Sequence, residues 1–209
     1  MNFPVVFDSS NNKIVIAYGD NSDSDKGKAI VGTVSGTGIS FGSEAEFEAG
    51  STNSICATFD SSNNKVVIAY SDEGVNGQGT AIVGTVSGTS ISFGTAVVFD
   101  SDNSNMPSLT FDTNANKVVI AYQDRGTDGS DQGTVITGSV SGTSITFDTA
   151  TEFDDSDVNS IGCTFDSNSK RVSIAYADQG NSTYGTGIIL TPAGTPEDLT
   201  IGQQYFVQT

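Results

Sequence analysis

The sequence predicts an all-β protein, a β-propeller of four repeated four-stranded antiparallel blades. Three observations predict it: one phrase occurs four times, short β-branched runs alternate with turns, and helical periodicity is absent. The phrase joins Phe-Asp to Ala-Tyr-x-Asp and begins at Phe7, Phe59, Phe111 and Phe165. A regular period near 50 residues is typical of repeat architectures, whose units bury their faces against their neighbours. We expect one domain over 1–209, with repeats at approximately 1–50, 51–102, 103–156 and 157–209.

The first half of the second repeat predicts a hairpin. Residues 54–60 alternate like a half-buried strand, and 61–65 contain two consecutive asparagines, which tolerate the positive φ of a tight turn. We expect Asp60 to accept hydrogen bonds from the backbone of that turn. The next strand, 66–70, is apolar at every position, so both of its faces should be covered. A neighbouring layer on each side of the sheet is therefore predicted, as between propeller blades.

The second half of the repeat predicts a loop and two more strands. Residues 71–79 form a polar, glycine-rich loop, 80–86 form the third strand, and a fourth strand bends around Gly94. Four strands in about 50 residues match a propeller blade. A β-solenoid would repeat its turns at half that spacing, and separate sandwiches need longer units.

The fourth repeat departs from the pattern after Leu190. Its C-terminal segment is expected either to complete the last blade or to act as an arm exchanged with another copy. Four blades are few for a closed ring. Closure within one chain, joining of chains and loss of blades from a longer parent therefore all stay open.

The net charge and the apolar content limit which partners the protein is expected to bind. The net charge is −17, from 25 acidic and 8 basic residues, so phosphate backbones and anionic membranes are repelled and no nucleic-acid partner is expected. The longest apolar runs are far too short to cross a membrane, so no membrane insertion is expected. The N-terminus shows no signal peptide, which fits a virion protein released by lysis or a mature piece of a longer protein. Cys56 and Cys163 are expected to be free buried thiols on opposite faces.

The scarcity of residue types that commonly act in catalysis argues against an enzyme. There is no histidine, which excludes histidine-dependent triads and dyads, and Arg125 and Arg171 are too few for a sialidase-type arginine cluster. Paired carboxylates could hydrolyse glycosides. However, every prominent acid lies in a polar turn and none in an apolar run, so we expect none with a raised pKa.

Calcium is the one cofactor for which the sequence offers candidate ligands. Oxygen ligands alternate along the first loop at Asn21, Asp23 and Asp25, as in acidic calcium loops. The third repeat adds the candidates Asp124, Asp128 and Asp131. A simply solvated loop is the competing interpretation. Sugar binding would have to use Tyr184 or Tyr205, because there is no tryptophan.

Two segments resemble a known group of proteins. Phe59-Asp-Ser-Ser-Asn-Asn-Lys-Val-Val-Ile-Ala-Tyr70 and Gly79-Thr-Ala-Ile-Val-Gly-Thr-Val-Ser-Gly-Thr-Ser-Ile-Ser-Phe-Gly94 are similar to repeats of marine bacteriophage tail-fibre and other virion structural proteins. The likeness extends over nearly the whole chain, and residues 199–209 resemble the ends of such arrays.

The resemblance implies a non-enzymatic role in the virion or outside the cell. The first interpretation is adhesion to a host surface glycan or protein through the variable loops 19–28, 71–79, 123–133 and 177–186. The second is a structural subunit of an extracellular filament or tube, assembled through the C-terminal arm. Self-association or contact with other virion proteins is expected in either case.

Overall fold

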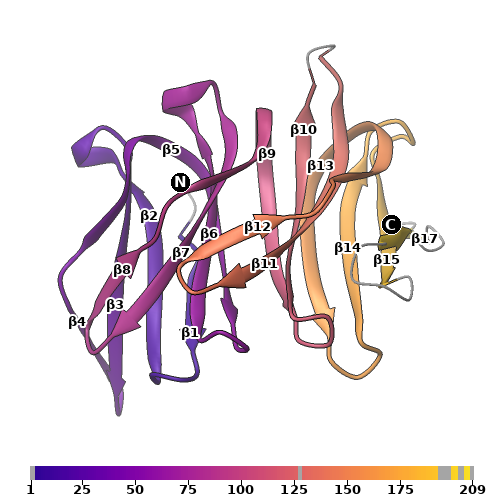
Figure 1. Ribbon diagram of the computed structural model, residues 1–209. Coiled ribbons are helices and arrows are strands. Elements are labelled where there is room, and N and C mark those ends of the chain that lie inside the picture. The colour runs from indigo at the N-terminus through magenta and orange to yellow at the C-terminus, as the bar shows by residue number, and fades with distance from the viewer. Residues whose placement is uncertain (1–2, 127–128, 193–198, 202–204, 208–209) are drawn as a thin grey trace.

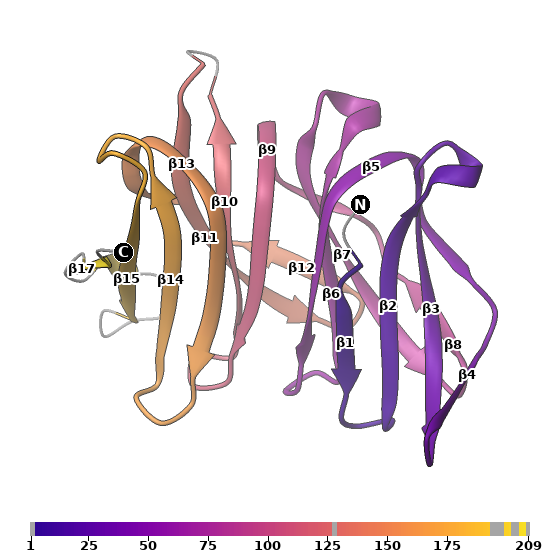
Figure 2. The same ribbon diagram turned by 180° about the vertical axis from the view of Figure 1, so that it is seen from behind.

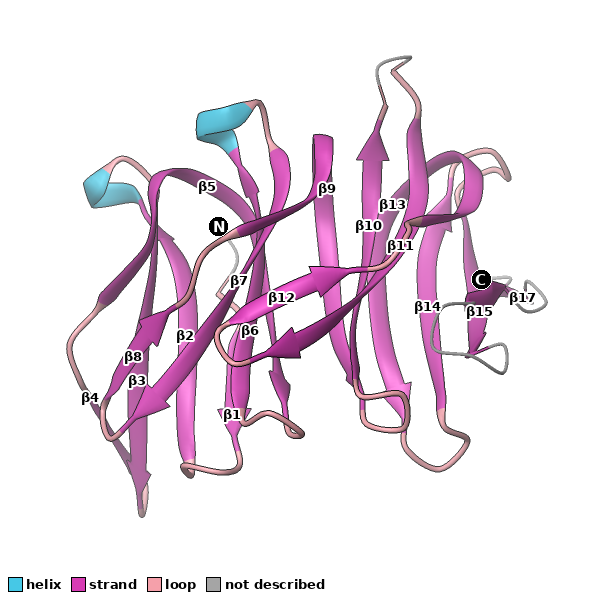
Figure 3. Ribbon diagram, in the orientation of Figure 1, coloured by secondary structure: helices cyan, strands magenta, loops and turns pink. Residues whose placement is uncertain are grey.

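The protein is all-β and antiparallel. The computed structural model describes residues 3–126, 129–192, 199–201 and 205–207, with seventeen strands joined in one sheet (Figure 1). Two single-turn 3₁₀ helices, η1 (Asn21–Asp23) and η2 (Glu73–Val75), lie in loops (Figure 3). Within the described residues, no helix has the length and apolar character needed to cross a membrane.

The strands fall into four modules that follow the sequence repeats. Module 1 (3–51) contains β1 (Val5–Asp8), β2 (Lys13–Asp20), β3 (Lys26–Ser35), β4 (Gly38–Phe41) and the first part of β5 (Ala45–Asp60). Module 2 (52–103) contains the rest of β5, then β6 (Lys65–Asp72), β7 (Gln78–Ser87), β8 (Ser90–Phe93) and the first part of β9 (Val97–Asp112). Module 3 (104–157) contains the rest of β9, then β10 (Lys117–Arg125), β11 (Asp131–Ser141), β12 (Ser144–Phe147) and the first part of β13 (Thr151–Asp166). Module 4, from 158 on, contains the rest of β13, then β14 (Arg171–Asp178), β15 (Tyr184–Pro192), β16 (Leu199–Ile201) and β17 (Tyr205–Val207).

Three long strands carry the chain from one module to the next. Residues 45–51 of β5 pair with β3, and residues 52–60 of the same strand pair with β6. The ladder slips between Asn53 and Cys56, where Ser54 has a φ of 49°. Met106 and Ser160 occupy the same place in β9 and β13, with φ of 48° and 53°. Each bulge re-aims the strand, so the last strand of one module continues as the first strand of the next.

The predicted hairpin turns are confirmed at one edge of the sheet. Asp60 Oδ1 accepts hydrogen bonds from the backbone nitrogens of Ser62 and Asn63, at 2.8 and 3.0 Å. Asp8, Asp112 and Asp166 accept the equivalent pairs of backbone bonds in the other modules. The last residue of each turn has positive φ, namely Asn12, Asn64, Asn116 and Lys170. The bent fourth strand is also confirmed, because β7 pairs first with β8 and then with β9.

The two-sided burial predicted for residues 66–70 is confirmed and explains how modules join. Val66, Ile68 and Tyr70 pack towards module 1, in a core that includes Val15 and Val31. The alternate residues Val67 and Ala69 pack towards module 3. We call the side facing the preceding module the upstream face and the opposite side the downstream face. Each core therefore lies at a junction, between the downstream face of one module and the upstream face of the next.

The four modules form an open row. Module 1 and module 4 lie at opposite ends in both views (Figures 1 and 2). In the described part of the chain, β1 pairs only with β2, and both β16 and β17 pair only with β15. The antiparallel all-β class is thus confirmed, while closure into a propeller stays a prediction.

Both cysteines are free thiols, as predicted. Cys56 is buried at the junction of modules 2 and 3. Cys163 is only partly buried, contrary to expectation, although it packs against the core between modules 3 and 4 and its Sγ donates to the Ser108 carbonyl at 3.1 Å. Burial still raises the pKa of Cys163 to about 11, so this thiol is protonated at neutral pH.

Candidate functional site

The variable loops gather at one edge of the row. They connect the second and third strands of each module and lie opposite the edge that carries the four aspartate turns (Figure 3). The first two loops share a fold: Asp20 and Asp72 cap η1 and η2, and each helix is followed by a residue with positive φ, Ser24 or Asn76. The backbone is therefore constant where the side chains differ.

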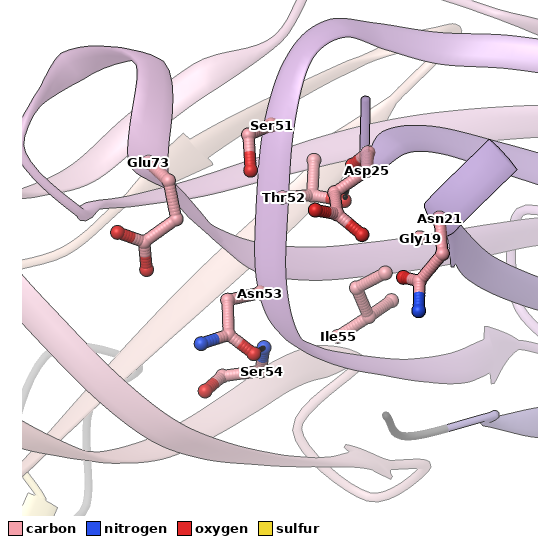
Figure 4. Close-up of a pocket in the computed structure, with 9 residues that line it drawn as sticks. All are labelled: Gly19, Asn21, Asp25, Ser51, Thr52, Asn53, Ser54, Ile55 and Glu73. Atoms are coloured by element: carbon pink, nitrogen blue, oxygen red, sulfur yellow. Dashed lines mark hydrogen bonds between the residues drawn. The ribbon is translucent and has the colours of Figure 1, made fainter. Parts of the chain in front are cut away.

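A polar cleft of about 280 Å³ opens between the loops of modules 1 and 2. Its floor is the bulged part of β5, and Figure 4 shows Asn21 and Asp25 on one side of that strand and Glu73 on the other. The strand is fixed to the first loop, because Thr52 donates to the Asp25 carbonyl from both its backbone nitrogen and its Oγ1, at 2.8 and 3.0 Å. Carboxylate, amide and hydroxyl groups can bind hydroxyl-rich ligands.

One residue of the cleft differs in size from its equivalent in module 2. Ser51 pairs with Lys26, and the equivalent residue of module 2, Asn103, pairs with Gln78. The longer Asn103 side chain reaches over its loop and donates to the Asn76 carbonyl at 3.2 Å. Ser51 is too short for this contact, so the space between the first two loops stays open. Ser51 was not predicted as a site residue. Only its difference from Asn103, at the equivalent position of the next repeat, could have pointed to it.

Of the calcium candidates of the first loop, Asp23 is paired with two lysines. Asp23 lies 3.0 Å from Lys28 Nζ and 3.4 Å from Lys26 Nζ, and hydrogen bonding to Lys28 lowers the pKa of its carboxyl group. Asn21 and Asp25 line the cleft. Two ammonium groups beside Asp23 compete with any cation there, so calcium binding by this loop stays a prediction.

The two described candidates of the third repeat, Asp124 and Asp131, have different partners. Asp131 pairs with Arg125 at 2.7 Å, and Asp128 lies outside the described residues. Asp124 lies instead with Asp100 and Asp102, each offering an oxygen within 4.8 Å of the others. Three hard oxygen donors suit a divalent cation in type, although acidic side chains often cluster without one.

Sequence reasoning missed a pair of acids that recurs at the junctions. Each pair joins an acid from the last strand of one module to the aspartate that follows Ala-Tyr-x in the next, namely Glu48 with Asp72, Asp100 with Asp124, and Asp154 with Asp178. A buried tyrosine lies beside each pair: Tyr70 donates to Glu48 at 3.0 Å and Tyr176 to Asp154 at 2.8 Å. Burial is the main cause that raises the pKa of these tyrosines, and the neighbouring acids add to it. The two acids of a pair belong to different repeats, so one repeat read alone does not reveal them.

Asp100 corrects the expectation that no acid has a raised pKa. Its side chain is 9% exposed, and burial followed by the charge of Asp102 raises the pKa of its carboxyl group. Its Oδ1 accepts the backbone N–H of Asp102 at 3.0 Å, while Oδ2 has no hydrogen-bond partner. The sequence places Asp100 at the start of a polar stretch, and only the junction with module 3 buries it.

We expect Asp100→Asn to raise the melting temperature in metal-free buffer at pH 7. A carboxyl group whose pKa is raised by folding destabilises the native state as pH rises through that pKa, and asparagine removes the charge but keeps an acceptor for Asp102. Calorimetry with Asp155→Asn, at an exposed position outside this cluster, as the control measures the effect. A lower melting temperature for Asp100→Asn would contradict this prediction.

The same scan of the wild type with added calcium tests the calcium prediction. An unchanged melting temperature would contradict calcium binding.

Comparison with known proteins adds no functional assignment. No protein-family model matches the sequence, and no curated protein matches it. The function must therefore be argued from the residues themselves.

Proposed function

We propose that the chain is a non-enzymatic structural or adhesion protein of a phage virion, which contacts a host surface through the loops 19–28, 71–79, 123–133 and 177–186. The observation that carries this proposal is the position of these loops. Their described parts share one edge of the row, and they differ in sequence more than the strands do. Varied loops on a fixed scaffold are the usual arrangement of a binding surface.

The cleft between the first two loops supports a glycan or a polar protein segment as the ligand. It is lined by amide, hydroxyl and carboxylate groups, which are suited to hydroxyl-rich ligands. Tyr184 in the fourth loop is 42% exposed and offers a ring on which a sugar could stack. The side chain of Tyr205 lies outside the described residues.

A propeller-like assembly is part of this proposal. The modules pack face to face through apolar junctions, as blades do, and each module has the four antiparallel strands of a blade. A location in the virion or outside the cell completes the proposal, which rests for this point on the resemblance of the repeats.

A loop exchange tests the adhesion proposal. Residues 21–26 are replaced by the sequence of residues 73–78, which has the same length and the same 3₁₀ turn. Because the backbone stays alike while Asn21 and Asp25 are lost from the cleft, we expect binding to fall at least about tenfold. Binding of labelled protein is measured by flow cytometry on a panel of marine bacterial cells and on arrays of their surface polysaccharides.

The matched control exchanges a turn at the opposite edge. Ser61→Thr, Ser62→Asn and Asn63→Ala together give module 2 the turn of module 3 and leave Asp60 in place. We expect this variant to bind like the wild type. Wild-type protein that binds none of the cells or glycans, or binding that survives exchange of the loops, would overturn the proposal.

A further inference from the structure

The two ends of the row are the unmatched halves of one kind of junction. Within the described residues, the upstream face of module 1 and the downstream face of module 4 are each left open. Between them, three junctions show how these two kinds of face fit together. The ends can therefore be compared with covered faces, position by position.

The upstream face of module 1 has the residues of a junction without its cover. Ile39 is 44% exposed, whereas the equivalent Ile91 and Ile145 are 5% and 1% exposed. Val34, which pairs with Ile39, is 52% exposed, and its equivalent Val86 is 7% exposed. Large apolar side chains that a neighbouring module covers elsewhere thus face solvent here. Shallow apolar patches of this kind mark interaction sites on soluble proteins.

A hollow marks the centre of this exposed face. It measures about 230 Å³ and lies among the side chains of Phe3, Ile16, Tyr18, Ile30 and Phe41. The equivalents of Ile16 and Tyr18 in module 2, Ile68 and Tyr70, are fully buried by module 1.

The downstream face of module 4 has the matching small residues. In module 2 this face consists of Val67, Ala69, Ala81 and Val83, which receive the large side chains of module 3. The same paired positions in module 4 are Ser173, Ala175, Gly187 and Ile189. They line an open apolar hollow of about 420 Å³.

We propose that copies of this chain associate head to tail, with the upstream face of module 1 of one copy docked on the downstream face of module 4 of another. The contact repeats the internal junctions, with large side chains set against small ones. Two upstream faces would instead set bulky side chains against bulky side chains. A head-to-tail contact is heterologous, so it closes into a ring or extends as a filament according to its rotation.

This surface differs from the loop edge and from the C-terminal arm. The association therefore holds or fails independently of the adhesion proposal. The residues argued for the two docking faces all lie in the described part of the chain, whereas residues 193–198, 202–204 and 208–209 of the arm do not. Each copy has a net charge of −17, so we expect association to strengthen as salt screens the repulsion between copies.

Two variants that each damage one face test the proposal. Ile39→Asp places a charge on the upstream face of module 1, and Ala175→Asp places one on the downstream face of module 4. Both positions are exposed in the single chain, so we expect both variants to fold, as checked by circular dichroism and melting. Sedimentation velocity at 0.5 M salt over a concentration series then measures association of each protein.

The mixing result separates head-to-tail association from other modes. We expect the wild type to form multimers, and each variant to weaken self-association at least about tenfold. An equimolar mixture of the variants should form a 1:1 dimer and nothing larger, since it retains one intact pair of faces. Val98→Asp, at a position 48% exposed but on neither end face, should associate like the wild type.

Three results would overturn the proposal. The first is a wild type that stays monomeric across the series. The second is an Ala175→Asp variant that still self-associates, which indicates contact between two upstream faces. The third is a mixture in which the two variants do not bind each other.

Discussion

Replacement of Ile68 by alanine is expected to lower the free energy of unfolding by about 2–5 kcal/mol. Ile68 is fully buried at the centre of β6, in the core between modules 1 and 2. Truncation removes apolar contacts on the upstream face, and β6 cannot move into the space, because its downstream face packs on module 3 at the same time. A cavity is therefore left. Denaturant unfolding monitored by circular dichroism measures the loss.

The control is the same substitution at the end of the row. Ile16 occupies the position of Ile68 in module 1, but it lines the open hollow and is only partly buried. Ile16→Ala should cost less than about 1.5 kcal/mol, measured at a concentration where the protein is monomeric. The difference between the two losses measures how much the covering by module 1 contributes to the free energy of unfolding at this position. Equal losses would show that the junction between modules 1 and 2 does not support the fold.

The sequence predicted the elements whose signals lie within one repeat. Asp60 and its asparagine turn, the two-sided strand 66–70 and the strand bent at Gly94 all follow from local chemistry. The continuous strands β5, β9 and β13 were missed. Positive φ occurs there at Ser54, Met106 and Ser160. None of these is glycine or asparagine, so the residue types did not predict a bulge.

The candidate site was harder to predict because its parts come from neighbouring repeats. The cleft combines Asn21 and Asp25 of module 1 with Glu73 of module 2. Asp124 lies beside Asp100 of the preceding module and not with Asp131, which pairs with Arg125. Contacts between repeats depend on how modules stack, and the pattern inside a single repeat does not contain that information.

Neighbouring modules approach closely at Gly94. The backbone nitrogen of this residue donates to the Val83 carbonyl at 2.9 Å, at the point where the fourth strand bends. A Cβ atom added to Gly94 would lie 1.9 Å from the carbonyl oxygen of Thr143, in the β11–β12 turn of module 3. Gly42 has the same relation to Thr89 of module 2. The neighbouring turn therefore occupies the space that any side chain would need.

The third module shows that the neighbour, not the bend, requires glycine. Asp148 stands at the position of Gly94 and makes the same backbone bond, from its nitrogen to the Thr137 carbonyl at 2.9 Å. In the fourth repeat the Ser-Gly turn that would approach it is replaced by the sequence Thr-Pro-Ala-Gly-Thr-Pro. Asp148 carries a side chain that pairs with Lys117 at 2.9 Å, so the bend itself does not require glycine.

Gly94→Ala is therefore expected to lower the free energy of unfolding by about 1–3 kcal/mol or more, since the added methyl group meets backbone that cannot rotate away. Gly38→Ala is the matched control, because its Cβ would approach no atom closer than 3.7 Å. We expect it to be nearly neutral in the same denaturant titration. The cost of Gly94→Ala should come from separating modules 2 and 3, so the exposure of Cys56 to a thiol reagent should rise with it. A stable Gly94→Ala variant with Cys56 still protected would mean that the modules do not pack as closely as the junction requires.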